Sequence, residues 1–309
     1  IKINKNMQKY DLGIAYVWEY DQEFVDLTER IFQQGGLSTF RITEANLGEV
    51  RRHVESGKLG FTSYLDRAWD VSEEFEALGN ILNRRRTRIF NPYKNVLHAI
   101  DKATMHLEFI TAGLQVPYSI IIPPHDETED LYVSLRDLAR IGRPFIIKPC
   151  NTTGGGVGVV TGAESLQQVL DERLLNAEDK YLIQEKVYPK VLHGRRAWFR
   201  CFWAYSEPIP VWWDDTTHIY ETLEPDEVAR YQLKPLFTLT KKIADLTGLD
   251  FFSTEIAVSQ NGDFVVIDYV NDQCDMRLRS NHFDGVPDSI AERIIRNMKM
   301  AVRQQLKRQ

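Results

Sequence analysis

The order of hydrophobic and polar positions predicts that strands alternate with helices in the first part of the chain. Buried apolar runs predict strands over 12–17, 38–42, 59–64 and 87–90. Helical spacing of apolar positions predicts helices over 23–34, 47–55 and 72–82. Strands that alternate with helices form mostly parallel sheets, so we expect a parallel-sheet α/β domain over residues 1–92.

From residue 93 onward the strands and helices follow one another less regularly. The pattern predicts helices over 96–112, 131–141, 163–175, 235–247 and 289–306. It predicts extended segments or strands over 116–122, 145–147, 181–185, 197–204, 252–258 and 264–270. A turn at Asn261-Gly262 joins the last two strands as a hairpin, because both residues tolerate positive φ. We divide this part into a small central subdomain, 93–182, and a C-terminal α+β subdomain, 183–309.

Composition narrows the class of protein. The net charge of −6 disfavours nucleic acid or an anionic membrane as the main partner, and no apolar run approaches the roughly 18 residues of a membrane span. Cys150, Cys201 and Cys274 are far apart and odd in number, which argues against a disulfide framework and a zinc site. The polar start lacks a signal-peptide core, and a reducing cytoplasm is the expected location.

A lysine followed by a glycine cluster is the strongest local signal. Lys148 ends a predicted buried strand, where an ammonium is costly unless an anion meets it. The backbone of Gly154, Gly155, Gly156 and Gly158 can approach phosphate oxygens closely. The spacing matches neither a P-loop nor a dinucleotide fingerprint. A flexible hairpin with an edge lysine is the alternative.

Two acids and an amide on the last predicted hairpin form the second signal. The turn brings the strand of Glu255 alongside the strand of Asp268, and Asn271 follows. Carboxylate and amide oxygens suit Mg²⁺, which completes its octahedron with phosphate oxygens and water. The alternative is a surface hairpin whose acids point outward.

Together the two signals resemble the ATP-grasp superfamily over essentially the whole chain. The resemblance lies in the order of the lysine, the glycine loop, the strand Leu182 to Glu185, and the acids of the hairpin. It implies an ATP-grasp fold of the D-alanine ligase or glutamate ligase type, with the central subdomain as a lid. It also implies ATP and two Mg²⁺ ions, for which Mn²⁺ can substitute, bound between the lid and the C-terminal subdomain.

The resemblance assigns roles to individual residues. Lys102, in an Asp-Lys pair after Asn91-Pro92, and Lys148 look like the two nucleotide-binding lysines, Lys148 also being catalytic. Arg200 resembles the catalytic arginine near the terminal phosphate, although a buried ion pair is its alternative. The hinge that meets adenine falls on Gln184, Glu185, Lys186 and Val187, and the metal ligands fall on Glu255, Asp268 and Asn271.

The chain departs from the family pattern after Asp268. One more residue than usual separates this acid from Asn271, which leaves Asp272 open as the third ligand, and no Pro-Gly follows. The stretch from Trp212 to His218 is interpreted as a surface loop packed by its tryptophans, with a substrate-facing loop as the alternative.

The expected reaction is ATP-dependent C–N ligation. A substrate carboxylate would be activated as an acyl phosphate and attacked by an amine or other nucleophile. A small-molecule kinase and a non-catalytic nucleotide-binding module stay open. The expected partners are a small-molecule acid and a nucleophile, and a homodimer is left open.

Overall fold

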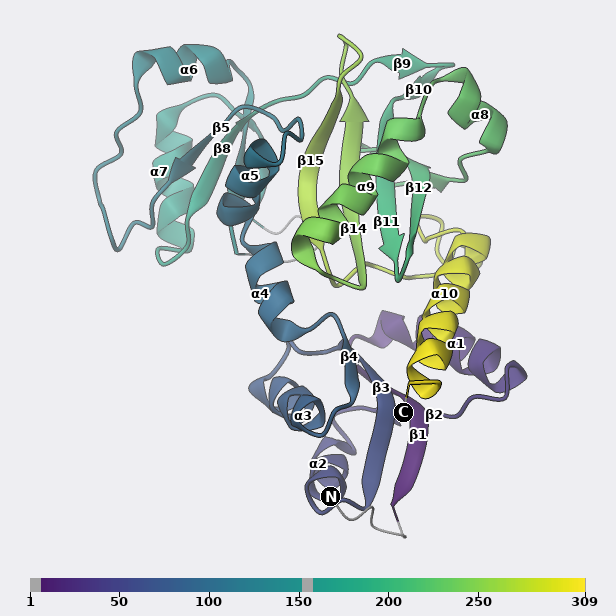
Figure 1. The fold of residues 1–309 in the computed structure, drawn as a ribbon. Coiled ribbons are helices and arrows are strands. Elements are labelled where there is room, and N and C mark those ends of the chain that lie inside the picture. The colour runs from purple at the N-terminus through teal and green to yellow at the C-terminus, as the bar shows by residue number, and fades with distance from the viewer. Residues whose placement is uncertain (1–6, 152–157, 309) are drawn as a thin grey trace.

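The first sheet is parallel, as predicted from the sequence. This computed structural model describes residues 7–151 and 158–308. The sheet has the order β2-β1-β3-β4, formed by β1 (Gln8–Tyr16), β2 (Thr39–Ile42), β3 (Leu59–Arg67) and β4 (Arg88–Phe90). Its connections contain η1 (Glu19–Asp21), α1 (Gln22–Gln34), α2 (Leu47–Glu55) and α3 (Glu73–Arg84). These elements form the lower block of Figure 1.

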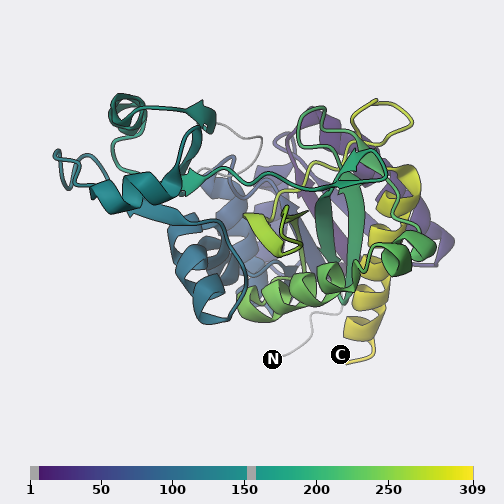
Figure 2. The same cartoon turned by 90° about the horizontal axis from the view of Figure 1, so that it is seen from above.

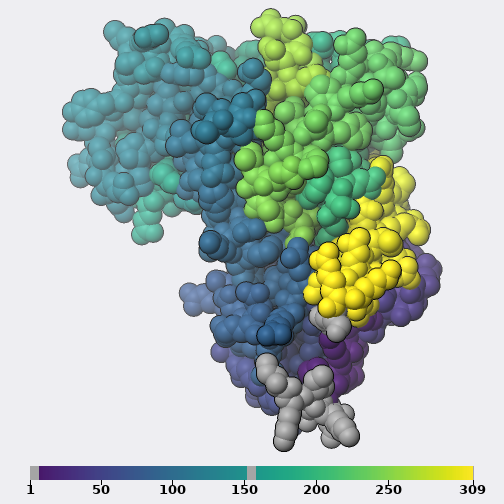
Figure 3. Space-filling view, in the orientation of Figure 1, coloured from purple at the N-terminus to yellow at the C-terminus, as the bar shows by residue number. Residues whose placement is uncertain are grey.

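Helices cover this sheet because its strands are apolar on both faces. Leu12 and Ile14 of β1 share a buried cluster with Phe24 of α1, while Ala15 lies in a second cluster with Leu78 of α3. The last helix, α10 (Asp288–Leu306), returns to the first sheet and packs on α1 and β3 (Figures 1 and 3). No helix within the described ranges is both long and apolar enough to cross a membrane.

The second sheet is antiparallel and carries two helices. Its order is β5-β8-β6-β7, formed by β5 (Ser119–Ile122), β6 (Phe145–Pro149), β7 (Val160–Ala163) and β8 (Tyr181–Glu185). With α6 (Leu135–Ile141) and α7 (Leu166–Leu175) it lies at one end of the molecule, opposite α10 (Figure 2). The helix predicted over 163–175 begins later, because Ser165 and Gln168 form a capping box at the start of α7.

The third sheet is antiparallel and has the order β13-β12-β11-β14-β15. Its strands are β11 (Trp198–Ala204), β12 (Glu207–Trp213), β13 (Tyr220–Glu221), β14 (Phe251–Val258) and β15 (Phe264–Asn271). A two-stranded ribbon, β9 (Val191–Leu192) and β10 (Arg195–Arg196), precedes it, and α8 (Pro225–Arg230) and α9 (Lys234–Thr247) follow β13. β8 continues across residue 183, and the domain boundaries at 92 and 182 stay a prediction.

The loop interpretation of the tryptophan pair was wrong. Trp212 and Trp213 are buried residues of β12, and the Trp212 ring packs on Phe199 of β11 with centroids 4.4 Å apart. An aromatic pair across neighbouring strands stabilises this part of the sheet.

The single helix predicted over 96–112 is two helices. α4 (Tyr93–Ile100) ends at Asp101, whose backbone is extended, and α5 (Lys102–Thr111) begins directly after it. The Asp101 carboxylate accepts the backbone N–H groups of Ala103 and Thr104 at 2.9 and 3.2 Å, which caps α5. It also pairs with Lys180 at 2.5 Å. The break therefore places Lys102 at a helix N-terminus.

Candidate functional site

Two carboxylates lie opposite each other on β14 and β15. Glu255 is paired with Asp268 across the strands; Glu255 is buried, Asp268 is half-buried, and both lie among cations. Burial raises the pKa of Glu255, and Arg200 only partly offsets this effect. Burial would also raise the pKa of Asp268, but Lys102, Lys148 and Arg200 together lower it below the ordinary value. The site therefore holds Asp268 as an anion.

Glu255 is fixed from the neighbouring strand β11. Its two carboxylate oxygens accept the Trp198 indole N–H at 3.0 Å and form an ion pair with Arg200. The Arg200 guanidinium also lies over the Trp213 ring, 4.4 Å from its centroid. The buried ion pair considered for Arg200 is thus present, and it is formed with a predicted metal ligand.

Two irregularities in β15 flank Asp268. Ile256 pairs with Val266 and Glu255 pairs with Asp268, so Ile267 is an additional residue between the two pairs. A second shift in register lies between the pair Glu255–Asp268 and the pair Ser253–Asn271. β-bulges of this kind redirect side chains and leave backbone groups unpaired.

Lys148 contacts the backbone at the first bulge. This buried residue of β6 donates a hydrogen bond from Nζ to the backbone oxygen of Ile267 at 3.0 Å. Burial lowers the pKa of its ammonium, while Asp268 and Glu255 oppose that shift. Through this hydrogen bond Lys148, a predicted phosphate-binding lysine of the second sheet, contacts β15, the strand of the third sheet that carries Asp268.

Lys102 joins the same group of charges. Its backbone N–H donates to the oxygen of Cys150, just beyond β6, at 3.0 Å, and its charge acts on both Lys148 and Asp268. The structure thus brings together both predicted lysines, the acid pair and Arg200.

The second bulge bears on the third predicted metal ligand. Because Asn271 is paired with Ser253, it lies on the face of the sheet that carries Glu255 and Asp268. Its Oδ1 is buried and has no hydrogen-bond partner. Asp272 accepts the Trp69 indole N–H at 2.9 Å through Oδ2, while its Oδ1 is also buried without a hydrogen-bond partner.

The donor set fits a hard divalent cation held jointly with a bound phosphate. Mg²⁺ takes one or two carboxylates and keeps its other positions for phosphate and water. Two carboxylates and the unpartnered oxygen of Asn271 supply this kind of set. Within the ranges 7–151 and 158–308, no three His, Cys, Asp or Glu side chains gather into a metal site of their own.

The predicted hinge continues from β8. Gln184 is buried, and its side-chain N–H groups reach Ser119 at 3.1 Å and Tyr269 at 3.3 Å. The Glu185 carboxylate accepts the backbone N–H of Tyr118 at 2.7 Å. Two further hinge positions follow the strand. The Lys186 ammonium lies 5.9 Å from the Tyr188 ring centroid, and Val187 is partly buried against the largest apolar cluster.

The glycine cluster is only partly described. Gly154, Gly155 and Gly156 lie outside the described residues. Gly158 has φ of +72°, and a side chain there would also place Cβ 3.2 Å from Pro149. Both its backbone conformation and the approach of β6 therefore favour glycine at position 158.

Sequence reasoning missed two features next to the site. Trp198 has the same strand parity as Arg200, so alternation along the strand could have identified it. The contact between His106 and the Tyr269 hydroxyl, at 2.5 Å, has no comparable signal, because it joins segments more than a hundred residues apart.

No family model and no curated protein sequence matches the chain. Solved structures do match along almost its whole length. A RimK domain protein ATP-grasp from Sphaerobacter thermophilus is 20% identical, with a TM-score of 0.62, over 93% of this chain and 98% of that chain. D-alanine–D-alanine ligase from Bacillus anthracis, complexed with ATP, is 14% identical, with a TM-score of 0.63, over 96% and 98%. The chain has the ATP-grasp fold.

A third solved structure agrees with this fold. The ATP-grasp ligase PsnB, complexed with minimal precursor, Mg and ADP, is 15% identical, with a TM-score of 0.61, over 94% of this chain and 98% of that chain.

Proposed function

We propose that this ATP-grasp chain is an ATP- and Mg²⁺-dependent carboxylate–amine ligase. The observation that carries the proposal is the meeting of Lys102 and Lys148 with Glu255 and Asp268, beside the unpartnered oxygen of Asn271. Cations and acids that perturb one another's pKa values cluster at functional sites. The ligase names of the matched structures, and the ATP, Mg and ADP that two of them contain, support the same conclusion.

The two lysines bind the phosphates of ATP in this proposal. In the described structure the buried Lys148 ammonium has a single hydrogen bond, to Ile267, and a phosphate oxygen would add an anionic hydrogen-bond partner. Lys102 approaches from the N-terminus of α5, where the positive end of the helix dipole also favours an anion. The glycine run from Gly154 to Gly158 is the proposed source of backbone N–H groups for the phosphates.

The acids and the amide hold the metal. Glu255, Asp268 and Asn271 are the proposed ligands of two Mg²⁺ ions, for which Mn²⁺ can substitute. When bound, Mg²⁺ supplies positive charge that offsets the charge of the phosphates. Asp268 is held as an anion by the surrounding cations and is therefore ready to coordinate without losing a proton.

Arg200 is the proposed catalytic arginine. Its guanidinium is oriented in advance by Glu255 and by the Trp213 ring, so little conformational entropy is lost when it meets the transferred phosphoryl group. Its Nε is buried without a hydrogen-bond partner. The hinge formed by Gln184, Glu185, Lys186 and Val187 meets the adenine.

The proposed reaction has two steps. A carboxylate oxygen of the acid substrate attacks the γ-phosphorus of ATP and releases ADP, which forms an acyl phosphate. The nitrogen of an amine then attacks the acyl carbon, phosphate leaves, and the amine gives up a proton. The expected partners are therefore a small-molecule acid and a nucleophile, in a cytoplasmic setting.

Trapping with hydroxylamine tests the reaction. The protein is supplied with Mg²⁺, ATP and pools of carboxylic acids, with and without hydroxylamine. A ligase forms a hydroxamate together with ADP and free phosphate, because hydroxylamine intercepts the acyl phosphate. A stable phosphate ester without hydroxamate would refute ligation and identify a kinase. Tight ATP binding with no turnover on any pool would favour the non-catalytic module.

A further inference from the structure

A buried polar network lies directly behind the proposed nucleotide site. The Tyr269 hydroxyl contacts His106 Nδ1 at 2.5 Å and accepts a hydrogen bond from Gln184 Nε2 at 3.3 Å. Gln184 also donates to Ser119 at 3.1 Å. All three side chains around the hydroxyl are nearly inaccessible to solvent, with exposed fractions of 2% for Tyr269, 4% for His106 and 1% for Gln184.

The direction of each hydrogen bond follows from the donors present. Gln184 donates through its amide N–H, so the Tyr269 oxygen accepts there and its own proton is free to point to His106. His106 then accepts at Nδ1 and carries its proton on Nε2. A neutral imidazole is required for this arrangement, and burial lowers the pKa of His106 accordingly.

Each partner in the network belongs to a segment that carries a different part of the proposed site. His106 is on α5, which begins with Lys102. Gln184 is on β8, which leads into the hinge. Tyr269 follows Asp268 on β15 and therefore lies on the opposite face of the strand. The hydroxyl is thus a common contact of the adenine, phosphate and metal segments.

We propose that the Tyr269 hydroxyl is a positioning group that fixes the spacing between the hinge and the phosphate and metal groups of the nucleotide site. The inference rests on the proposed function, because it assumes that these segments bind ATP. The aromatic ring has a separate role, since it packs edge-on against Phe109 with centroids 5.2 Å apart. Removing only the hydroxyl therefore separates positioning from core packing.

Tyr269→Phe tests the proposal, with Tyr181→Phe as the matched control. Tyr181 has the same exposed fraction and lies on β8, but its hydroxyl donates to the backbone oxygen of Glu172, at 2.8 Å, and contacts neither His106 nor Gln184. Each variant loses one hydroxyl that forms a hydrogen bond, and both should lower the melting temperature. The dissociation constant of ATP with Mg²⁺, measured by calorimetry on folded protein, should rise about tenfold in Tyr269→Phe and stay within about twofold in Tyr181→Phe.

A pair of substitutions at His106 provides an independent measurement, which also serves if Tyr269→Phe does not fold. His106→Asn keeps an acceptor near the position of Nδ1 and should retain most of the ATP affinity, whereas His106→Leu should lose it about tenfold. A merely structural role would lower the melting temperature of both variants without separating their affinities.

The outcomes distinguish this inference from the proposed function. ATP affinity that is unchanged in folded Tyr269→Phe, or equal in His106→Asn and His106→Leu, would overturn the positioning role alone. A wild-type protein that does not bind ATP with Mg²⁺ would overturn the proposed function and the inference with it.

Discussion

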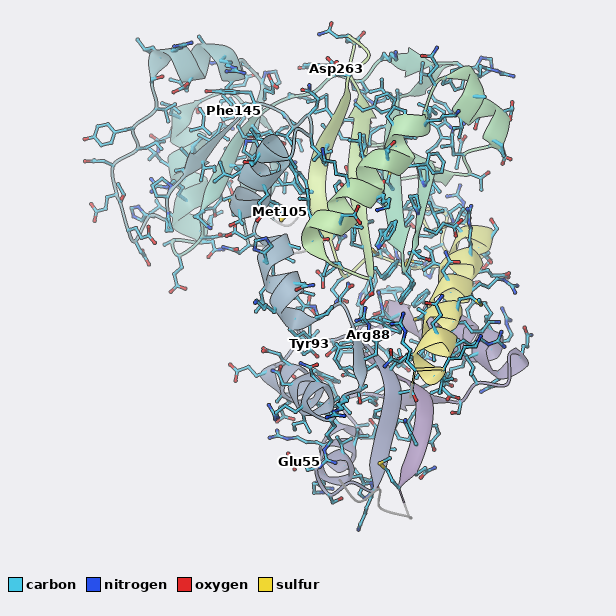
Figure 4. The ribbon with its side chains drawn as sticks, in the orientation of Figure 1. Glu55, Arg88, Tyr93, Met105, Phe145 and Asp263 are labelled. Carbon is cyan, nitrogen blue, oxygen red and sulfur yellow. The ribbon has the colours of Figure 1, made fainter. Side chains whose placement is uncertain are left out.

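Replacing Asp66 with Asn should stabilise the protein near neutral pH. Asp66 is buried at the end of β3, where its carboxylate accepts the Tyr93 hydroxyl and the backbone N–H of Ala68, the latter at 2.9 Å. Tyr64 and Asp70 are the other titratable groups that act on it, and both lie on or directly after the same strand. Figure 4 shows Tyr93 at the start of α4, where the lower block joins the rest of the molecule.

The magnitude follows from the pKa of this carboxyl. Burial raises the pKa of Asp66 from 3.8 to about 6, although hydrogen bonds from Tyr93 and Ala68 oppose the shift. A raised pKa means that the protonated form is favoured by folding. The resulting stability is full below about pH 4 and is lost as the pH rises through about 6. A shift of about two units corresponds to about 3 kcal/mol, which ionised Asp66 costs at neutral pH.

Asn at this position stays neutral at every pH. Its oxygen can still accept the Ala68 N–H, and its N–H group can donate to the Tyr93 oxygen. We expect Asp66→Asn to raise the free energy of unfolding by up to about 3 kcal/mol near pH 8 and to change it little near pH 4.

Urea unfolding of wild type and variant at several pH values measures this difference. Asp263→Asn is a suitable control, because Asp263 lies at the turn between β14 and β15, far from Tyr93 (Figure 4). The control should shift the free energy of unfolding by less than about 0.5 kcal/mol at any pH. A variant that loses the same stability near pH 4 and near pH 8 would refute the reasoning, since hydrogen bonding and not ionisation would then dominate.

Four further changes test the fold and the site. Gly79→Ala should destabilise the protein by about 1–3 kcal/mol in urea unfolding, because the new Cβ would lie 1.8 Å from the Tyr93 hydroxyl; unchanged stability would contradict this packing. Lys148→Ala should weaken ATP binding about a hundredfold in calorimetry, and unchanged affinity in folded protein would remove the central element of the proposed site. Asp268→Asn should keep the circular dichroism spectrum and abolish Mg²⁺-dependent ADP release, whereas retained activity would make the hairpin merely structural. Asn271→Ala should raise the Mg²⁺ concentration needed for half-maximal ATP binding, and an unchanged Mg²⁺ requirement would exclude Asn271 as a ligand.

Hydrophobic periodicity was sufficient for the first sheet but not for the helix after it. The apolar runs of β1 and β3 predict a covered parallel sheet because consecutive apolar residues place apolar side chains on both faces of a strand. The segment over 96–112 also keeps helical spacing through Asp101, so its pattern shows no interruption. The break depends on the bonds of Asp101 to Ala103, Thr104 and Lys180, and only the last of these partners is distant in sequence. Local capping by Asp101 competes with continuation of the helix, and the spacing of apolar positions gives no sign of this competition.

The bulges of β15 explain why the spacing of the acid and the amide was ambiguous in the sequence. Alternation assigns a face to each strand residue by parity, and under that rule Asp268 and Asn271, three positions apart, would lie on opposite faces. One additional residue reverses the parity, so Asn271 pairs with Ser253 on the face of Glu255. Bulges are set by the fit of two strands and by the contacts that unpaired backbone groups find, neither of which is a property of one segment.

The same bulges let one strand supply three different groups within a few residues. The carbonyl of Ile267 meets Lys148 at the strand edge, the carboxylate of Asp268 lies on one face, and the hydroxyl of Tyr269 reaches His106 from the other. In a regular edge strand, successive backbone carbonyls point alternately toward the neighbouring strand, here β14, and away from it. Because the irregular geometry joins the lysine, the metal ligand and the positioning hydroxyl, a small shift of β15 would move all three together. The tests of Lys148, Asp268 and Tyr269 are therefore not independent. In a variant that combines these changes, the loss of ATP binding free energy should be smaller than the sum of the losses in the single variants.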